Sequence, residues 1–96
     1  MSSRTQLLED LRAIRRERDQ LLARVAAGEL DLPAVLSMAA TRREVAECYV
    51  TKIVEALPGV GKVRGRRLLA DIGVAPRTRC SDLSARHRDD IVRELA

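Results

Sequence analysis

The chain has 96 residues, of which 46% are hydrophobic and 33% are charged, and Tyr49 is its single aromatic residue. This composition excludes a disordered chain, and the length predicts a single domain, residues 1–96, with a modest core of aliphatic side chains. The net charge of +4 comes entirely from residues 49–96, which hold ten bases and six acids, whereas residues 1–48 hold eight of each. One-sided positive charge is typical of proteins with phosphate-rich partners. A solvated basic surface without a partner is the alternative.

The first predicted element is a long helix over residues 4–27. Apolar residues recur there at spacings of three and four, as in an amphipathic helix. They are Leu7, Leu11, Ile14, Leu21 and Val25. Ser3 is a candidate N-cap, and Gly28 suits a left-handed residue just past the helix end. Charges every few residues argue against a targeting leader at the N-terminus, and no apolar stretch is long enough to span a membrane.

Two further helices are predicted next. Asp31 is the candidate N-cap of the first, with Pro33 in its first turn. The second begins at Thr41, because Thr41 and Glu44 match the S/T-x-x-E capping box, and it continues without a break to about residue 57. Pro58 ends it, because the residue before a proline is pushed out of the α region.

A glycine turn at residues 59–61 leads into a helix over residues 62–72. Gly65 falls on the apolar side of that helix, where a residue without a side chain allows close packing against a neighbouring helix. Gly73 is the expected C-cap. After a loop, Ser84 is the candidate N-cap of a last helix.

Together these elements predict an all-α fold of about five helices. The long N-terminal helix precedes a compact helix-turn-helix-type core over residues 42–96, and no segment shows the alternating pattern of a strand. Cys48 and Cys80 form no C-x-x-C motif, and His87 is the only histidine. The sequence therefore predicts no metal and no cofactor, and it predicts reduced thiols in a cytoplasmic protein.

The turn has the features of a phosphate-binding site. A helix N-terminus leaves its first N–H groups without intrahelical partners and carries partial positive charge. Glycine lets an anion approach such a backbone closely, and Lys62, Arg64, Arg66 and Arg67 follow at once. The pattern is neither a Walker loop nor a dinucleotide-binding G-x-G-x-x-G motif, so a nucleotide site is not predicted. A plain turn followed by a solvated basic helix is the alternative.

Residues 50–76, VTKIVEALPGVGKVRGRRLLADIGVAP, resemble the helix–hairpin–helix and helix-two-turn-helix group of proteins that bind the DNA backbone. In layout the whole chain is similar to the actinobacterial integration host factor family, whose pattern at the turn is L-P-x-V-G-K-V-(R/K). The resemblance implies a monomeric, all-helical, nucleoid-associated protein of the cytoplasm. Such a protein would bind and shape double-stranded DNA with little sequence preference.

The resemblance also assigns DNA-binding residues. The turn contacts fall on Gly59, Val60, Gly61, Lys62 and Arg64. The charge of the chain itself adds further basic residues expected at the interface: Arg66, Arg67, Arg77, Arg79 and Arg86. A later family turn ends R-G-L-G, whereas this chain has Ser81-Asp82-Leu83-Ser84. An acid thus stands where the family backbone would approach DNA, and the arginines nearby are expected to compensate.

Two other functions fit parts of the sequence. One is binding of structured RNA through the same hairpin, and the other is a protein-interaction module that docks through the long N-terminal helix. The lack of aromatic residues favours duplex DNA over single strands, because single-stranded bases are bound by stacking on aromatic side chains. An enzyme is not predicted, because Asp89 and Asp90 point apart on a helix and His87 has no identifiable partner.

Overall fold

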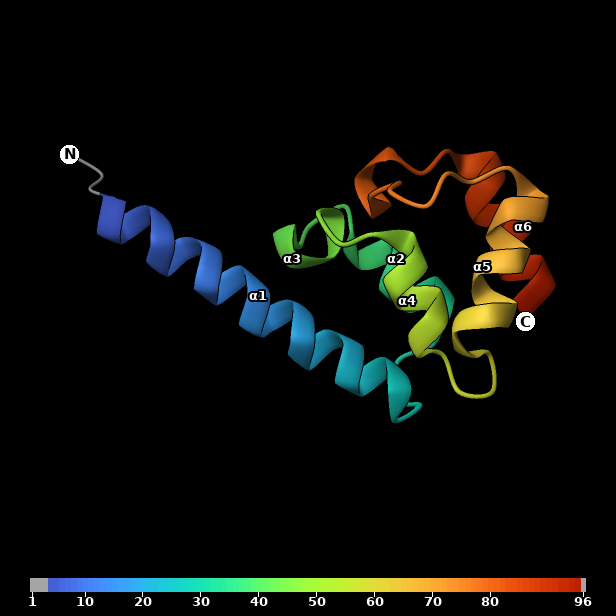
Figure 1. Cartoon of the computed structure of the whole chain (residues 1–96), viewed down its shortest axis with the longest axis horizontal. Helices are drawn as coiled ribbons and strands as arrows, with labels where there is room; N and C mark the ends of the chain where they lie inside the picture. Colours follow the sequence, from blue (N-terminus) through green and yellow to red (C-terminus); the bar gives the residue numbers. More distant parts are fainter. Residues whose placement is uncertain (1–3, 96) are drawn as a thin grey trace.

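The computed structural model describes residues 4–95, which form helices joined by short connections (Figure 1). The helices are α1 (Arg4–Ala26), α2 (Leu32–Met38), α3 (Arg43–Ala46), α4 (Val50–Ala56), α5 (Gly61–Ile72) and α6 (Ala85–Leu95), with a 3-10 turn, η1 (Cys80–Asp82), before α6. No strand is present between residues 4 and 95, so the predicted all-α class is confirmed. None of these helices is long and apolar enough to cross a membrane.

Helix α1 is the longest element and lies beside the group formed by the other helices (Figure 1). It packs against α3 and α4, and its buried residues, Leu21 and Val25, lie in its C-terminal half. Its N-terminal half extends past the other helices (Figure 1), and the molecule measures 46 × 26 × 23 Å. In the remainder of the fold α4 packs on α5, and α6 contacts both α5 and α2.

Most of the predicted helix ends are confirmed. The Asp31 carboxylate accepts a hydrogen bond of 2.9 Å from the backbone N–H three residues later, and the Ser84 hydroxyl accepts one of 3.1 Å from the N–H of His87. Gly28 and Gly73 have φ values of 78° and 96°, as expected of left-handed residues that follow a helix. The N-cap predicted at Ser3 lies outside the described residues.

The unbroken helix predicted over residues 41–57 is wrong. The chain forms α3 and α4 with a break at residues 47–49. Over residues 4–95 this break raises the number of α-helices from the expected five to six. In the break, Cys48 accepts a hydrogen bond from the N–H of Cys80, and the N–H of Val50 donates to Thr78, both at 2.9 Å. These bonds form an isolated antiparallel bridge with the loop after α5. Backbone pairing with a distant segment therefore replaces the local helical bonds that the sequence pattern predicts.

The predicted capping box at Thr41 is also wrong. The residue at the N-cap of α3 is Arg42, and no side chain caps this helix. Glu44, which should have reached back to the cap backbone, is buried and pairs with the Arg42 guanidinium at 2.6 Å. Because the Glu44 carboxylate is engaged in this ion pair, it does not accept the backbone hydrogen bond that a capping box requires.

The core is aliphatic, as the composition predicts. Its largest fully buried side chains are Ile53, Ile91, Val25, Val35, Val45, Val50 and Val54. Each contributes about 1.5–3 kcal/mol relative to an exposed side chain. These residues come from α1, α2, α3, α4 and α6, so the core joins α4, which precedes the glycine turn, to most of the fold.

Two buried cysteines flank the bridge between the break and the loop after α5. Burial raises the pKa of the Cys80 thiol from 9.0 to about 12, and the neighbouring Cys48 adds to the shift. Burial also raises the pKa of Cys48. Both thiols are uncombined, so the fold holds them in their neutral form.

The raised pKa of Cys80 predicts a loss of stability at high pH. The folded state holds this proton more tightly than the unfolded chain, so the stabilisation is complete below about pH 9 and is lost as the pH rises toward 12. We expect the urea midpoint to fall through this range, and to fall less steeply in Cys80→Ala. If the urea midpoints of the two proteins fall equally with pH, the Cys80 thiol does not contribute to the loss of stability.

Candidate nucleic-acid interface

The connection between α4 and α5 is a tight turn built on two glycines. Leu57 leaves the helical region, with ψ of 136°, as expected before Pro58. Gly59 and Gly61 then adopt φ values of 79° and 72°, which residues with a side chain rarely adopt. Apart from the glycine itself and its two chain neighbours, no heavy atom of the described residues lies within 4 Å of the position that a Cβ would take on either glycine. The outer surface of the turn is therefore open to a ligand.

The backbone N–H groups of the turn differ in their availability. The N–H of Val60 donates to the carbonyl of Leu57 at 3.2 Å, and the Val60 side chain packs against the core. Within residues 4–95, the N–H groups of Gly61 and Lys62 have no acceptor, as expected at the start of a helix. A ligand at the turn would therefore be bound by the N–H groups of Gly61 and Lys62. Val60 instead stabilises the turn through its bond to Leu57 and its contact with the core.

Close packing of α4 on α5 holds this turn in place. Gly65 is buried, and a Cβ on it would lie 3.1 Å from Val54 Cγ1 and 3.5 Å from Val60 Cγ1. The first distance is shorter than ordinary van der Waals contact, and the second is at its lower limit. The prediction that Gly65 is a helix-packing position is confirmed.

The four bases of α5 are exposed, but they are not equivalent. Arg66 forms an ion pair of 2.7 Å with Glu55 of α4, whose side chain is only 7% exposed. Arg64 extends back over the turn, where its guanidinium donates to the Gly59 carbonyl at 3.5 Å. Lys62 and Arg67 have no ion-pair partner among residues 4–95. Arg66 thus braces α5 against α4, whereas Lys62 and Arg67 offer unpaired charge.

The other predicted basic residues lie at different places on the surface. Arg77 lines a cleft of about 520 Å³ together with Arg66 and Lys52. Arg79 forms the bridge with Tyr49 and lines a second cleft. Arg86 is exposed on the first turn of α6 and lines neither cleft.

Lys52 was not among the residues predicted for the interface. It lies on α4 and lines both of the clefts that contain Arg77 and Arg79. Its sequence position on a helix with an apolar pattern gave no sign of this location. Lys52 comes to lie near Arg77 and Arg79 because α4 begins beside the loop after α5 in the folded chain.

The segment that departs from the family pattern, residues 81–84, begins in a short 3-10 turn. Residues 80–82 make up η1, with Ser81 and Asp82 exposed and Cys80 buried. The N–H of Asp82 donates to the carbonyl of Arg79 at 2.9 Å. An exposed carboxylate in this position opposes the approach of a phosphate.

Comparison with known proteins first defines the class of this fold. Residues 25–95 match the family model described as an S13-like H2TH domain. The matched range begins near the end of α1 and covers α2 to α6.

Full-length relatives then define the family. The chain is 33% identical to the integration host factor of Mycolicibacterium smegmatis and 32% identical to that of Mycobacterium tuberculosis, over 92 residues that cover 96% of this chain and 88% of each relative. It is 29% identical to the integration host factor of Streptomyces coelicolor, with 86% of that protein covered. The chain therefore belongs to the integration host factor family, as its sequence pattern predicts.

A solved structure supports the same assignment. The fold superimposes on a structure of sIHF bound to an 8-bp palindromic DNA with a TM-score of 0.87 and 27% sequence identity. The match covers 92% of this chain and 99% of that one. It therefore includes a long N-terminal helix as well as the helices around the turn.

Proposed function

We propose that this protein is a nucleoid-associated protein that binds double-stranded DNA through the phosphate backbone, with little sequence preference, and shapes it. The observation that carries the proposal is the open glycine turn at the start of the basic helix α5, in a chain of the integration host factor family. The related sIHF structure, which contains a short DNA duplex, supports the same function.

The chemistry of the turn explains how it would bind a phosphate. The N–H groups of Gly61 and Lys62 point out from the N-terminus of α5, where the helix carries partial positive charge. Glycine at positions 59 and 61 leaves room for a phosphate oxygen to reach them. The Lys62 ammonium adds a full charge, and Arg64 and Arg67 reach the neighbouring phosphates. These contacts carry no sequence information.

Further phosphate contacts are proposed on either side of the turn. Arg66 and Arg77 lie in one cleft, so they would act together, with part of the Arg66 charge already offset by Glu55. Arg79 and Arg86 would contact the backbone farther along the duplex. They would replace the contacts that the family makes through the glycines this chain has lost.

The proposal also covers the assembly and location of the protein. We propose that the protein acts as a monomer in the cytoplasmic nucleoid, and that DNA binding requires neither catalytic activity nor a cofactor. Structured RNA is the less favoured ligand, because the solved relative is bound to DNA.

A salt titration tests the proposed function. If about five phosphates are neutralised, the affinity for duplex DNA should fall roughly 10²–10³-fold between about 50 mM and about 200 mM salt. Gel shifts with several unrelated duplexes should give the same salt slope. A structured RNA of equal length, used as competitor, should displace the protein less effectively than duplex DNA. A single preferred duplex, or weak dependence on salt, would contradict backbone binding.

A further inference from the structure

The N-terminal half of α1 carries an apolar stripe that the fold leaves uncovered. Leu7, Leu8 and Leu11 are 59%, 46% and 41% exposed. They belong to the same helical repeat that continues as the buried Leu21 and Val25. One half of the repeat is therefore covered by α3 and α4, and the other half extends past them without a partner (Figure 1). Adjacent exposed leucines of this kind mark an interaction surface.

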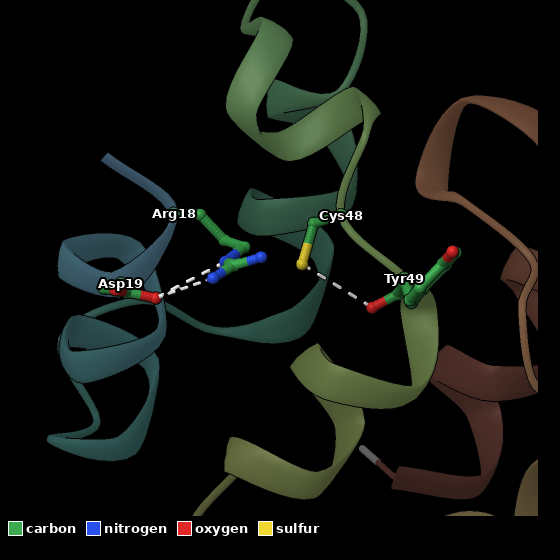
Figure 2. A network of polar contacts seen from close by, with 4 residues as sticks. All are labelled: Arg18, Asp19, Cys48 and Tyr49. Carbon is green, nitrogen blue, oxygen red and sulfur yellow. Dashed lines mark hydrogen bonds and ion pairs between the residues drawn. The ribbon is translucent and has the colours of Figure 1, made fainter. Parts of the chain in front are cut away.

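The stripe leads directly into a cleft. Leu11 and Ile14 form one wall of a space of about 590 Å³ between α1 and the chain at the start of α4. Figure 2 shows Arg18 extending from α1 toward Cys48, with Tyr49 beyond it. The cleft therefore joins the exposed leucines to the beginning of α4. We call the stripe and this cleft together the α1 groove.

The α1 groove has an excess of unpaired positive charge. Each of its acids is already matched by an arginine: Asp19 by Arg18 at 3.2 Å, Glu44 by Arg42 at 2.6 Å, and Glu47 by Arg43 at 3.2 Å. Its remaining bases have no ion-pair partner among residues 4–95; they are Arg15, Lys52 and Arg79. An occupant of the groove must therefore combine apolar groups with negative charge.

The shape and charge of the groove select among possible occupants. Duplex DNA supplies negative charge but no apolar surface that would cover Leu7 and Leu11. A second copy of the chain is also poorly matched, because residues 4–16 hold four arginines and two acids, so two copies would repel each other. A helix of another protein, with an apolar stripe and carboxylates at one end, satisfies both requirements.

From these observations we infer that the α1 groove is a docking site for an acidic amphipathic helix of a partner protein. The apolar side of that helix packs on Leu7, Leu11 and Ile14, and its carboxylates pair with Arg15 and Lys52. The site lies outside the glycine turn, so partner binding and phosphate binding at the turn are separate properties of the chain.

A library of 16-residue helical peptides, selected on the full-length protein, tests this inference. The selected peptides should share apolar residues at helical spacing and a cluster of Glu or Asp, and a scrambled version of each should bind about tenfold more weakly or worse. No enrichment, or enrichment of basic peptides, would overturn the inference.

Variants then locate the site of peptide binding, measured by fluorescence anisotropy. Two double variants should each weaken binding of the selected peptide at least about tenfold: Leu7→Ser with Leu11→Ser, and separately Arg15→Glu with Lys52→Glu. Loss of one buried leucine contact alone lowers an affinity by that amount. Val63→Ser removes an apolar side chain that is 80% exposed on α5 and should have no effect. Equal binding by all of these variants would overturn the inference.

Two further measurements separate the groove from the alternatives. The Leu7→Ser, Leu11→Ser variant should bind duplex DNA as tightly as the parent, which keeps this test independent of the proposed DNA function. Arg79 lines the groove and is also a proposed DNA contact, so the competition is repeated with Arg79→Ala. Complete displacement of the peptide by a duplex in that variant would assign the groove to DNA instead. Concentration-dependent dimerisation that this variant abolishes would assign it to a second copy of the chain.

Discussion

Replacing both Lys62 and Arg64 by glutamate is expected to weaken duplex binding roughly 10²–10³-fold at low salt, because two phosphate contacts are lost and two repulsive charges appear beside the turn. The loss should be equal for unrelated duplexes, since the turn contacts phosphates and not base edges. The salt slope should also become shallower by about two. Fluorescence anisotropy with three or more duplexes at two salt concentrations measures all of these effects.

A matched variant separates the turn from the total charge of the protein. Lys62→Glu with Arg64→Glu lowers the net charge from +4 to 0, a change of two units at each position. Arg12→Glu with Arg16→Glu makes the same change on the exposed side of α1, away from the turn. We expect the α1 variant to lose only a few-fold in affinity. If both variants lose affinity equally, binding follows net charge and the turn has no special role.

The features that the sequence predicted well are those set by residues close together in the chain. The caps at Asp31, Gly73 and Ser84 each depend on groups within a few residues. The end of α4 before Pro58 and the positive φ values of the turn glycines are equally local. This is why the hairpin, the most informative part of the chain, could be located from its sequence.

The features that the sequence missed depend on distant contacts. The break at residues 47–49 exists because Cys48 and Val50 form backbone hydrogen bonds with residues about thirty positions away. The residues around Thr41 matched a helix cap as well as those at Asp31 and Ser84 did, but the Glu44 carboxylate pairs with Arg42 in the folded chain. Neither event leaves a signal at the spacings that helix prediction uses.

Contacts between elements also changed the expected roles of some site residues. Arg66 looked equivalent to Arg67 in the sequence, but the buried carboxylate of Glu55 engages it. Val60 was expected at the phosphate, whereas its side chain packs inward and its N–H is already bonded. The DNA-binding roles of these residues stay predictions, and the geometry ranks Lys62 ahead of Arg66 as the variant to test first.

Substituting Gly65 by leucine is expected to destabilise the fold by about 3 kcal/mol, the upper end of the usual range for overpacking. Even the first added carbon would lie 3.1 Å from Val54 Cγ1, and the rest of the side chain would force α4 and α5 apart. The variant should therefore show a lower urea midpoint. It should also bind DNA more weakly under conditions in which it is still folded, because the turn between these helices would change shape.

Two variants of α5 serve as controls for this result. Gly65→Ala adds one carbon and removes the helix penalty of glycine, about 1 kcal/mol, so its stability should lie much closer to that of the parent. Ala70→Leu places the same leucine side chain at an exposed position of α5, with one added carbon fewer than Gly65→Leu. It should change stability by no more than about 0.5 kcal/mol. Urea denaturation followed by circular dichroism compares the three. A Gly65→Leu protein as stable as Ala70→Leu would mean that the close contact of α4 with α5 does not hold the turn in place.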